Sequence, residues 1–489
     1  MFNILKIFTK KNKVVTRFAP SPTGFMHVGS VRTALFAYLF AKKNNGTFIL
    51  RIEDTDKERE VEGSIEHIIK SLKWLGVDWD EGPDIGGPNA PYIQSQRLDT
   101  YKKYALELYE KGLAYTDPYT KEELESFRKK SELENKAFLY RDYRPENPPK
   151  WDGTKPLRLK IQEAKRLTWT DLVRGELSAG PEALDDFILM KSDGYPTYNF
   201  AHIIDDLYMG VTHIMRADEF ISSTPKFLAL YEALGITRPE FATLPPILGD
   251  SGNKKLGKRD GAKDVLDYKE EGFLPEAIVN FLAFIGWNPG DDREIMSKEE
   301  IIQAFEISKI QIAGGKFNED KLIWTNKEYI KKLPVDRLKK EIGDRLKVKH
   351  AFTDELLNKV TPIIAERINT FGELEKYVVE GEFDYLFQAP EPKKEMLIWK
   401  KDTDFEIPKK NLQIISEILE KLSEADFKTD ESLKVILMPK ADELGKGSVL
   451  WPLRVSLSGK EKSPDPFSLL SILGKEESLK RIQTAIKVL

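Results

Sequence analysis

The first sixty residues alternate between short apolar runs, polar loops and one long segment of helical periodicity. Residues 14–18 begin with β-branched residues and predict a strand that enters the turn-rich loop 19–24. Residues 30–46 carry apolar side chains at helical spacing and end in Asn-Asn-Gly, and 48–52 form a second buried strand. The pattern predicts a right-handed, parallel strand–helix–strand unit. Ligands of such sheets bind beyond the carboxyl ends of the strands, where the polar loop and the acidic residues 53–56 both fall.

The pattern changes twice further along the chain. Residues 101–188 contain a charged, helix-like stretch and a Pro-rich segment, as expected of an insertion between two halves of a nucleotide-binding fold. α/β character returns at 187–191 and 211–216. Beyond about Trp324, Lys- and Glu-rich segments carry apolar residues three and four positions apart, which predicts a helical last third. The predicted fold class is therefore α/β of the Rossmann type, with an inserted domain and an all-α region after it.

Composition narrows the class of protein. A chain of 489 residues has room for about three domains or more. Hydrophobic residues at 40% and charged residues at 32% exclude a mainly disordered chain. The absence of Cys removes disulfides and thiolate metal sites and favours a cytoplasmic compartment. No membrane partner is expected, because no run approaches the ~18 apolar residues of a span.

Neither the opening residues nor the net charge decides between the alternatives for targeting and for an RNA partner. The opening residues 1–15 are expected to be a frayed extension, with organelle targeting as the alternative. A net charge of −4 neither supports nor forbids an RNA partner, since the clustering of Lys and Arg on one face matters more than the total.

Residues 17–30 combine the features of a phosphate-binding turn. Two prolines fix the loop backbone, and Gly24 can adopt dihedral angles that other residues avoid. Gly29 begins the helix, where unpaired N–H groups bind anions, and its missing side chain lets a nucleotide approach closely. His27 precedes it and can donate a hydrogen bond to a phosphate oxygen. A lone His-x-Gly is more often a plain turn, but the whole loop fits a phosphate site.

Residues 252–264 form a second candidate site, a loop with five basic residues. Reactions at phosphate groups build negative charge on the phosphate oxygens, so ammonium groups that contact them accelerate such reactions. Lys255 and Lys258 are the candidates. A basic run alone is usually a solvated surface loop, but its place after the second half of the α/β domain favours a role in catalysis.

The two loops together point to one family. Residues 20–30 resemble the "HIGH" signature of class I aminoacyl-tRNA synthetases in the form used by the bacterial glutamyl branch, and 51–56 are also similar to that branch. Residues 255–259 resemble the "KMSKS" signature, with Gly257 where the family usually has a small polar residue. The resemblance covers nearly the whole chain. It implies a class I synthetase catalytic domain, an all-α anticodon-binding region, and an enzyme that activates L-glutamate with ATP and transfers it to tRNA-Glu.

The same resemblance implies six segments along the chain. They are the first half of the Rossmann catalytic domain at 13–100, the inserted acceptor-end-binding domain at 101–188, the second catalytic half at 189–250, the KMSKS loop and stem-contact domain at 251–325, and two helical anticodon-binding domains at 326–385 and 386–489.

The resemblance also assigns the substrate sites. Arg17 and Tyr198 would meet the side-chain carboxylate of glutamate, and Arg216 would hold the α-carboxylate. Glu53 and Ser21 would receive the α-ammonium. A planar guanidinium is suited to carboxylates. The full glutamate set is Arg17, Ala19, Ser21, Glu53, Tyr198, His202 and Arg216. The ATP set is Gly24, His27, Gly29, Ser30, Glu219, Lys255 and Lys258, of which His27, Lys255 and Lys258 are expected to be catalytic.

Metal use is predicted from the insertion. Some members of the family carry a zinc knob whose ligands follow an Ala-Tyr pair as Cys-x-Cys. Here Ala114-Tyr115 is followed by Thr-Asp-Pro-Tyr, without a thiolate. Structural zinc needs four N or S ligands, so no zinc is expected, and Mg²⁺ is expected only as the partner of ATP.

The predicted helices at the end of the chain distinguish between related families of enzymes. Glutaminyl-tRNA synthetases end in β-barrels, and a short paralogue that glutamylates a modified tRNA base lacks this third of the chain. By resemblance, Arg367 reads the third anticodon position, which predicts an enzyme specific for tRNA-Glu, with charging of tRNA-Gln as the alternative. An inactive RNA-binding paralogue is disfavoured by His27, Gly29 and Lys258. Members of the family suggest a monomer.

Overall fold

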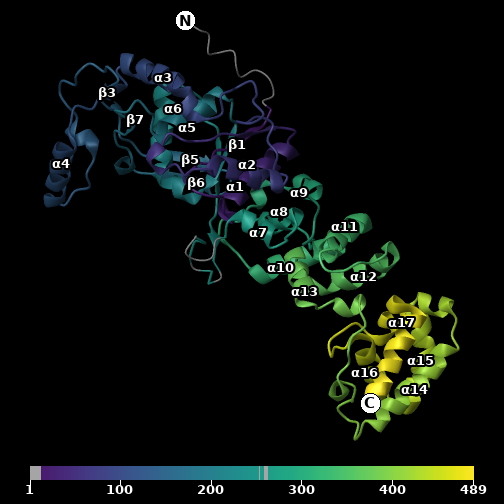
Figure 1. Ribbon diagram of the computed structural model, residues 1–489. Coiled ribbons are helices and arrows are strands. Elements are labelled where there is room, and N and C mark those ends of the chain that lie inside the picture. Colours follow the sequence, from purple (N-terminus) through teal and green to yellow (C-terminus); the bar gives the residue numbers. More distant parts are fainter. Residues whose placement is uncertain (1–12, 250, 253, 258–262) are drawn as a thin grey trace. The chain divides into compact units, whose positions relative to one another are not determined.

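The computed structural model describes residues 13–249, 251–252, 254–257 and 263–489 (Figure 1). The chain divides into two compact units. Unit 1 comprises Met1–Lys269 and Pro275–Thr325, and unit 2 comprises Glu270–Leu274 and Asn326–Leu489. The opening residues 1–12 lie outside the described residues.

Unit 1 begins with the predicted strand–helix–strand unit. β1 (Val15–Phe18) pairs in parallel with β2 (Thr47–Leu50), with Val15 opposite Thr47. Between them lies α1 (Val28–Lys43), whose buried side chains include Leu35 and Leu39. The helix ends at the predicted Asn-Asn-Gly stop, after two lysines that complement the negative end of the helix dipole. The parallel pairing confirms the arrangement that the hydrophobic pattern predicts.

A second sheet in unit 1 joins segments far apart in the sequence. β8 (His213–Ala217) and β9 (Glu240–Leu244) pair in parallel along five positions. β5 (Leu167–Asp171) pairs in parallel with β9 at Asp171 and Phe241, and in antiparallel fashion with β6 (Gly175–Ala179). β5 and β6 therefore belong to the sheet of β8 and β9, although the sequence pattern places 101–188 in an insertion.

The rest of the expected insertion forms a small antiparallel sheet of order β3-β4-β7. Its strands are β3 (Ala114–Thr116), β4 (Leu157–Leu159) and β7 (Ile188–Met190), and α4 (Lys121–Leu133) lies between the first two in the chain. The charged helix expected near 120–136 is thus present. The other helices and strands of unit 1 and its boundary are α2 (Ser64–Trp74), α3 (Leu98–Glu110), α5 (Tyr198–Tyr208), α6 (Thr224–Leu234), β10 (Ile247–Leu248), α7 (Val265–Glu270), α8 (Pro275–Ala283), α9 (Lys298–Ala304), β11 (Gly315–Lys316) and α10 (Glu319–Lys331).

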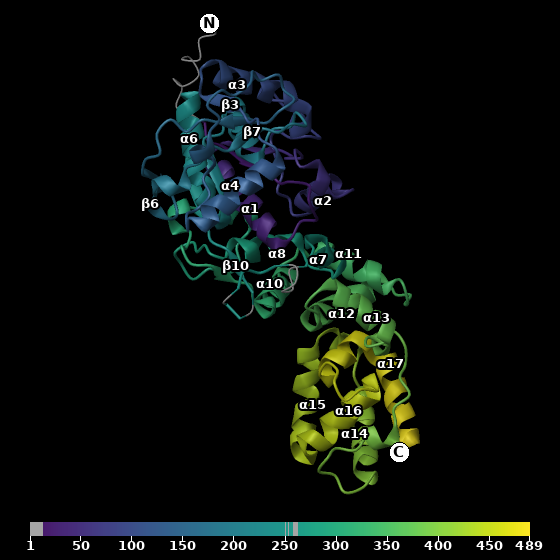
Figure 2. The same cartoon turned by 90° about the vertical axis from the view of Figure 1, so that its left-hand side faces the viewer.

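The described residues of unit 2 form helices joined by loops and no strand, as the three- and four-residue spacing predicts. α14, α15, α16 and α17 pack side by side, as Figure 2 shows. Its helices are α11 (Val335–Leu346), α12 (Asp354–Arg367), α13 (Phe371–Glu380), α14 (Glu406–Glu420), α15 (Asp430–Leu444), α16 (Lys446–Ser458) and α17 (Pro466–Val488). In the part of the chain that the structure describes, no helix is long and apolar enough to cross a membrane.

Candidate active site

A cavity of about 640 Å³ opens in unit 1 beyond the carboxyl ends of β1 and β8. This is where a parallel sheet binds its ligands. Most of the residues that the sequence assigns to the two substrates line it. They are Arg17, Ala19, Ser21, Gly24, His27, Gly29, Ser30, Glu53, Tyr198, Arg216, Glu219 and Lys255.

His27 connects the loop to the start of α1. Its Nδ1 accepts a hydrogen bond from the Gly29 N–H at 3.1 Å, and its own N–H donates to Ser30 Oγ at 3.2 Å. Because Nδ1 accepts, the ring proton lies on Nε2, which is therefore a donor. A Cβ on Gly29 would lie 3.0 Å from Cε1 of His27. Gly29 thus allows close packing of the histidine ring as well as the approach of a nucleotide.

Side-chain and backbone contacts hold the basic loop at its amino-terminal end. Lys255 Nζ forms an ion pair with Glu219, and Leu256 N–H donates to Ile247 O at 2.8 Å. Both partners of the ion pair are more than half exposed, so the pair is weak and an anionic ligand can compete with Glu219 for Lys255. Lys258, the other expected catalytic lysine, lies outside the described residues.

The carboxyl-terminal end of the basic loop meets the phosphate-binding turn. Val265 N–H donates to Met26 O at 3.0 Å, directly before His27. His67 Nε2 lies 2.8 Å from a carboxylate oxygen of Asp264. The two loops that the sequence singles out are therefore in contact, although more than 200 residues separate them in the chain.

Two buried charges of opposite sign face the cavity from neighbouring strands. Arg17 is 6% exposed at the end of β1, and Glu53 is 4% exposed after β2. Arg17 Nε donates to Asp206 at 3.1 Å, and Glu53 accepts from Arg51 Nη2 at 2.8 Å. Burial raises the pKa of Glu53, and the neighbouring Arg51 opposes that shift. The pair offers one cation and one anion to a zwitterionic ligand.

Arg216 provides a second cation with unsatisfied donors. Its Nη2 donates to Thr224 Oγ1 at 2.8 Å, but Nε and Nη1 have no hydrogen-bond partner among the described residues. The guanidinium lies 4.9 Å from the ring of Phe227 and 4.7 Å from that of Phe241. Burial lowers the pKa of Arg216. Buried donors without partners are costly, so this group is suited to an anionic ligand that supplies the missing acceptors.

Tyr198 and His202 differ in their position relative to the cavity. Tyr198 lines the cavity, and burial, followed by the charge of Glu53, raises the pKa of its hydroxyl. His202 is 1% exposed, stacks on Tyr198 with the ring centroids 4.6 Å apart, and is not among the residues that line the cavity. Its Nδ1 lies 2.7 Å from Tyr198 O, and burial lowers its pKa to about 3. A neutral His202 thus supports the tyrosine ring, whereas the sequence assigns it to the substrate.

A buried charge network that was not predicted from the sequence lies behind the cavity. Asp206 accepts hydrogen bonds from Arg17 and from Arg51, and both Asp206 and Arg51 are buried. The neighbouring Asp205 accepts from Arg97 at 2.7 Å. Two adjacent aspartates among the apolar residues of a helix could have predicted such a network, because buried carboxylates require charged or hydrogen-bonding partners.

The described residues provide no cluster of side chains that could bind a metal ion. Among residues 13–489, leaving aside those that the structure does not describe, no group of three or more His, Cys, Asp and Glu could hold an ion. The chain contains no Cys, so it has no Cys-coordinated zinc. Ion pairs organise the segment after Ala114 and Tyr115 instead. Arg158 Nε donates to Asp117 at 2.7 Å, and the Tyr140 hydroxyl donates to the same carboxylate at 2.6 Å.

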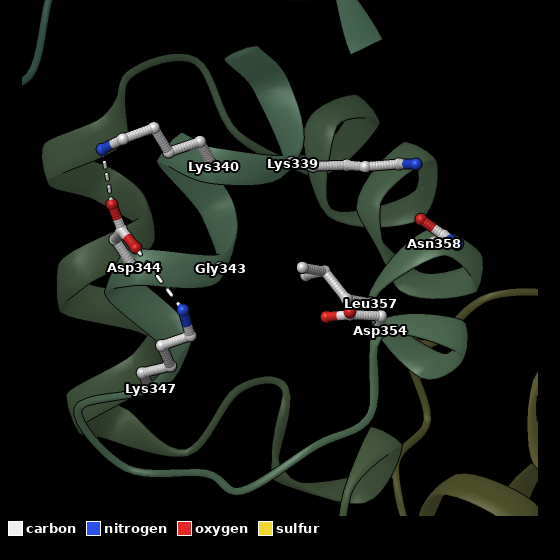
Figure 3. A pocket seen from close by; sticks show the side chains of 8 residues that line it. All are labelled: Lys339, Lys340, Gly343, Asp344, Lys347, Asp354, Leu357 and Asn358. Atoms are coloured by element: carbon white, nitrogen blue, oxygen red, sulfur yellow. Dashed lines mark hydrogen bonds and ion pairs between the residues drawn. The ribbon is translucent and has the colours of Figure 1, made fainter. Parts of the chain in front are cut away.

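Unit 2 contains the remaining predicted residue. Arg367 ends α12, and its Nη1 donates to the Tyr385 hydroxyl at 3.1 Å. A hollow of about 410 Å³ lies between α11 and α12 (Figure 3). Lys340 Nζ lies 2.8 Å from Asp344, and Lys347 Nζ lies 3.7 Å from it. The hollow contains none of the predicted site residues, and its paired surface charges indicate no particular ligand.

Two family models match the chain. The model described as "tRNA synthetases class I (E and Q), catalytic domain" matches residues 13–324, and the "Anticodon binding domain" model matches residues 334–486.

Individual proteins are similar over nearly their whole lengths. A glutamate–tRNA ligase of Clostridium kluyveri is 42% identical over 98% of both chains. One of Carboxydothermus hydrogenoformans is 41% identical over 96% of this chain and 99% of its own. The crystal structure of a glutamate tRNA ligase from Elizabethkingia meningosepticum, in complex with its amino acid, is 37% identical. It covers 98% of this chain and 100% of its own with a TM-score of 0.86.

Proposed function

This chain belongs to the glutamate–tRNA ligase family of class I aminoacyl-tRNA synthetases, and on that premise we propose roles for the residues of its cavity. Its activity is that of a glutamate–tRNA ligase, in which glutamate is activated with ATP and then joined to tRNA. One observation carries the assignment of roles. The cavity places the opposite charges of Arg17 and Glu53 beside the phosphate-binding turn of His27.

Glutamate is bound through its three charged groups. Arg17, with the hydroxyl of Tyr198, binds the side-chain carboxylate, and Arg216 binds the α-carboxylate with the donors that lack partners. Glu53 and Ser21 receive the α-ammonium. The uncharged amide of glutamine would leave a buried cation without its counter-charge, and sites built on such polar contacts discriminate by up to about 10⁴ to 10⁵.

ATP is bound between the phosphate-binding turn and the basic loop. The positive end of the α1 dipole and the His27 Nε2–H bind the phosphates in this part of the cavity. Lys255 and Lys258 stabilise the charge that develops on the α-phosphate and the pyrophosphate. Magnesium accompanies ATP as a counter-ion, held mainly through phosphate oxygens, since Mg²⁺ is usually bound by substrate phosphates with one or two carboxylates.

The reaction proceeds in two displacements. An oxygen of the glutamate α-carboxylate bonds to the α-phosphorus, the bond to pyrophosphate breaks, and glutamyl-adenylate forms. A hydroxyl of the terminal ribose of tRNA then attacks the adenylate carbonyl, loses its proton, and AMP departs. Positioning and charge stabilisation provide the rate enhancement, and no side chain forms a covalent intermediate.

The choice of tRNA is assigned to unit 2. Arg367 reads the third anticodon base, which makes the enzyme specific for tRNA-Glu.

The six segments expected from the sequence remain the proposed domain division, and the change from unit 1 to unit 2 after Thr325 supports its boundary there. A monomer and a cytoplasmic location complete the proposal, as expected from the sequence.

Aminoacylation of purified tRNA, with each amino acid offered separately, tests the substrate assignment. Glutamate should be charged and glutamine rejected. Arg17→Ala should raise the KM for glutamate far more than the KM for ATP, because Arg17 contacts only the amino acid. Equal effects on both substrates would remove Arg17 from the pocket that selects glutamate.

A further inference from the structure

Four side chains of alternating charge form one continuous chain of hydrogen bonds under the cavity. Arg17 Nε donates to Asp206 at 3.1 Å, and Arg51 Nη1 donates to the same carboxylate at 2.7 Å. Arg51 Nη2 then donates to Glu53 at 2.8 Å. The order is therefore cation, anion, cation, anion. Only the two ends, Arg17 and Glu53, line the cavity.

The two middle members are inaccessible to a substrate. The side chain of Asp206 is 1% exposed and that of Arg51 is fully buried. Burial alone would raise the pKa of Asp206, but Arg17 and Arg51 outweigh it and lower that pKa to about 2. Burial alone would likewise lower the pKa of Arg51, but its three carboxylate neighbours raise it well above the usual value. Both groups are therefore fully charged at neutral pH.

The four residues come from three elements whose spacing the network fixes. Arg17 lies at the end of β1, Arg51 and Glu53 follow β2, and Asp206 lies in α5. An arginine side chain has several rotatable bonds, so a single terminal contact with a ligand would not hold its guanidinium in one place. A charge-assisted bond at Nε fixes the plane of the Arg17 fork and leaves its outer nitrogens to face the cavity.

We propose that Asp206 and Arg51 are positioning residues, which set the separation and orientation of Arg17 and Glu53 to match the two ends of glutamate. This inference rests on the proposed function, in which Arg17 binds the side-chain carboxylate and Glu53 the ammonium. Asp206 acts on the substrate through Arg17, and Arg51 acts through Glu53. The network thereby sets the length of the amino acid that the pocket accepts.

Asp206→Asn in the full chain tests the inference, because it removes the charge while keeping the shape. Arg17 loses its charge-assisted partner, and its guanidinium is free to turn away from the substrate carboxylate. The KM for glutamate in aminoacylation should rise about 10- to 100-fold, the scale of a displacement of about 1 Å in a catalytic contact. The KM for ATP should change less than about twofold, because ATP makes no contact with Arg17.

Asp186→Asn is the matched control. Asp186 is equally buried and belongs to the same unit, but it accepts from the Tyr115 hydroxyl, from Arg144 and from the Ile161 N–H in the inserted sheet. This variant should lose stability while its KM for glutamate stays within about threefold of the unmodified value, which separates positioning from general structural support.

A double-mutant cycle shows whether Asp206 acts through Arg17. On an Arg17→Ala background, Asp206→Asn should add little to the KM for glutamate, because the residue that it positions is absent. Independent, additive effects would overturn the inference. If Asp206→Asn does not fold, Asp206→Glu keeps the charge, moves the carboxylate by one methylene and should raise the same KM.

The remaining outcomes separate this inference from the proposed function. An unchanged or lower KM for glutamate in Asp206→Asn, with Arg17→Ala still impaired, would overturn the positioning role alone. An Arg17→Ala variant with an unchanged KM for glutamate would instead overturn the proposed assignment of the pocket.

Discussion

The two ring nitrogens of His27 serve different purposes. Nδ1 caps α1 by accepting the Gly29 N–H, and this bond places the ring proton on Nε2. The residue is therefore part of the helix start as well as of the proposed ATP site. A single substitution of His27 changes both the helix cap and the proposed contact with ATP. The contributions to stability and to catalysis therefore need separate variants.

Replacement of His27 by Ala should lower the rate of activation by about 10² or more, as expected when one transition-state donor is lost. The same change should cost about 1 kcal/mol of stability, because an N-cap is removed. His27→Asn is the control, since Asn is a favoured N-cap. It should restore the denaturation midpoint but not the rate of pyrophosphate exchange measured with tRNA present. Near-normal exchange in a folded Ala variant would remove His27 from the chemistry.

His202 should make unit 1 sensitive to acid. Burial lowers its pKa in the folded chain from 6.5 to about 3, so the unfolded chain binds more protons between these values. Its contribution to stability is complete above about pH 6.5 and is lost as the pH falls toward 3. Between pH 7 and pH 5 the loss should be about 2 kcal/mol.

The measurement compares denaturant midpoints of the unmodified protein and of His202→Phe at pH 7 and pH 5. Phe keeps an aromatic ring against Tyr198 and cannot titrate. The difference between the two proteins should shift in favour of the Phe variant at pH 5. A difference independent of pH would show that His202 has the same pKa in the folded and the unfolded chain, and would contradict the lowering by burial.

At the scale of elements, ionic contacts hold the inserted sheet together. Asp186 lies just before β7 and accepts from the Tyr115 hydroxyl at 2.7 Å and from Arg144 at 2.5 and 2.7 Å. Its side chain is fully buried. The network joins β3, β7 and the segment between them without thiolate ligands.

Asp186→Ala should destabilise unit 1 by about 3 kcal/mol, because it leaves a partly buried arginine and a tyrosine hydroxyl without their acceptor. Asp152→Ala is a matched control, since Asp152 is exposed and bonds only locally, to Thr154. It should change stability by no more than about 0.5 kcal/mol. Urea denaturation measures both, and a zinc chelator should leave the midpoints unchanged. Equal midpoints for the two variants would contradict a stabilising role for the network.

At the scale of the whole molecule, amino-acid selection and tRNA selection are assigned to different units. The cavity of unit 1 is lined by most of the residues proposed to bind glutamate and ATP. Arg367, proposed to read the anticodon, lies in unit 2, where the Tyr385 hydroxyl accepts from it. A change in unit 2 can therefore alter which tRNA is charged without altering which amino acid is activated.

Arg367→Gln should raise the charging of tRNA-Gln relative to tRNA-Glu. Loss of a base contact by an Arg is worth about 1–3 kcal/mol, or roughly a 5- to 150-fold change in the ratio of kcat/KM values. The KM for glutamate should stay the same. Arg345→Gln is the control, because Arg345 lies on α11 and pairs with Glu341 and Glu375. Efficient charging of both tRNAs by the unmodified protein would contradict the reading role of Arg367.

The sequence by itself determined the features that depend on neighbouring residues. Short apolar runs bounded by turn residues predict the two strands, and apolar spacing of three to four predicts the helix between them and the helical last third. The turn that leads into α1 could also be predicted, since its residues lie within one loop of a dozen positions and share the start of the helix.

Tertiary structure alone decided the contacts between distant segments. Arg17 and Asp206 are 189 positions apart, and Arg51 and Asp206 are 155 apart, so local patterns carry no information about these bonds. The packing of α5 also decided that Tyr198 faces the cavity while His202, one turn later, lies behind it. Likewise, β5 and β6 join the sheet of β8 and β9 because strand pairing depends on partners that a single segment does not specify. A buried charge is stable only when an oppositely charged partner lies beside it, and only folding brings partners from distant segments together.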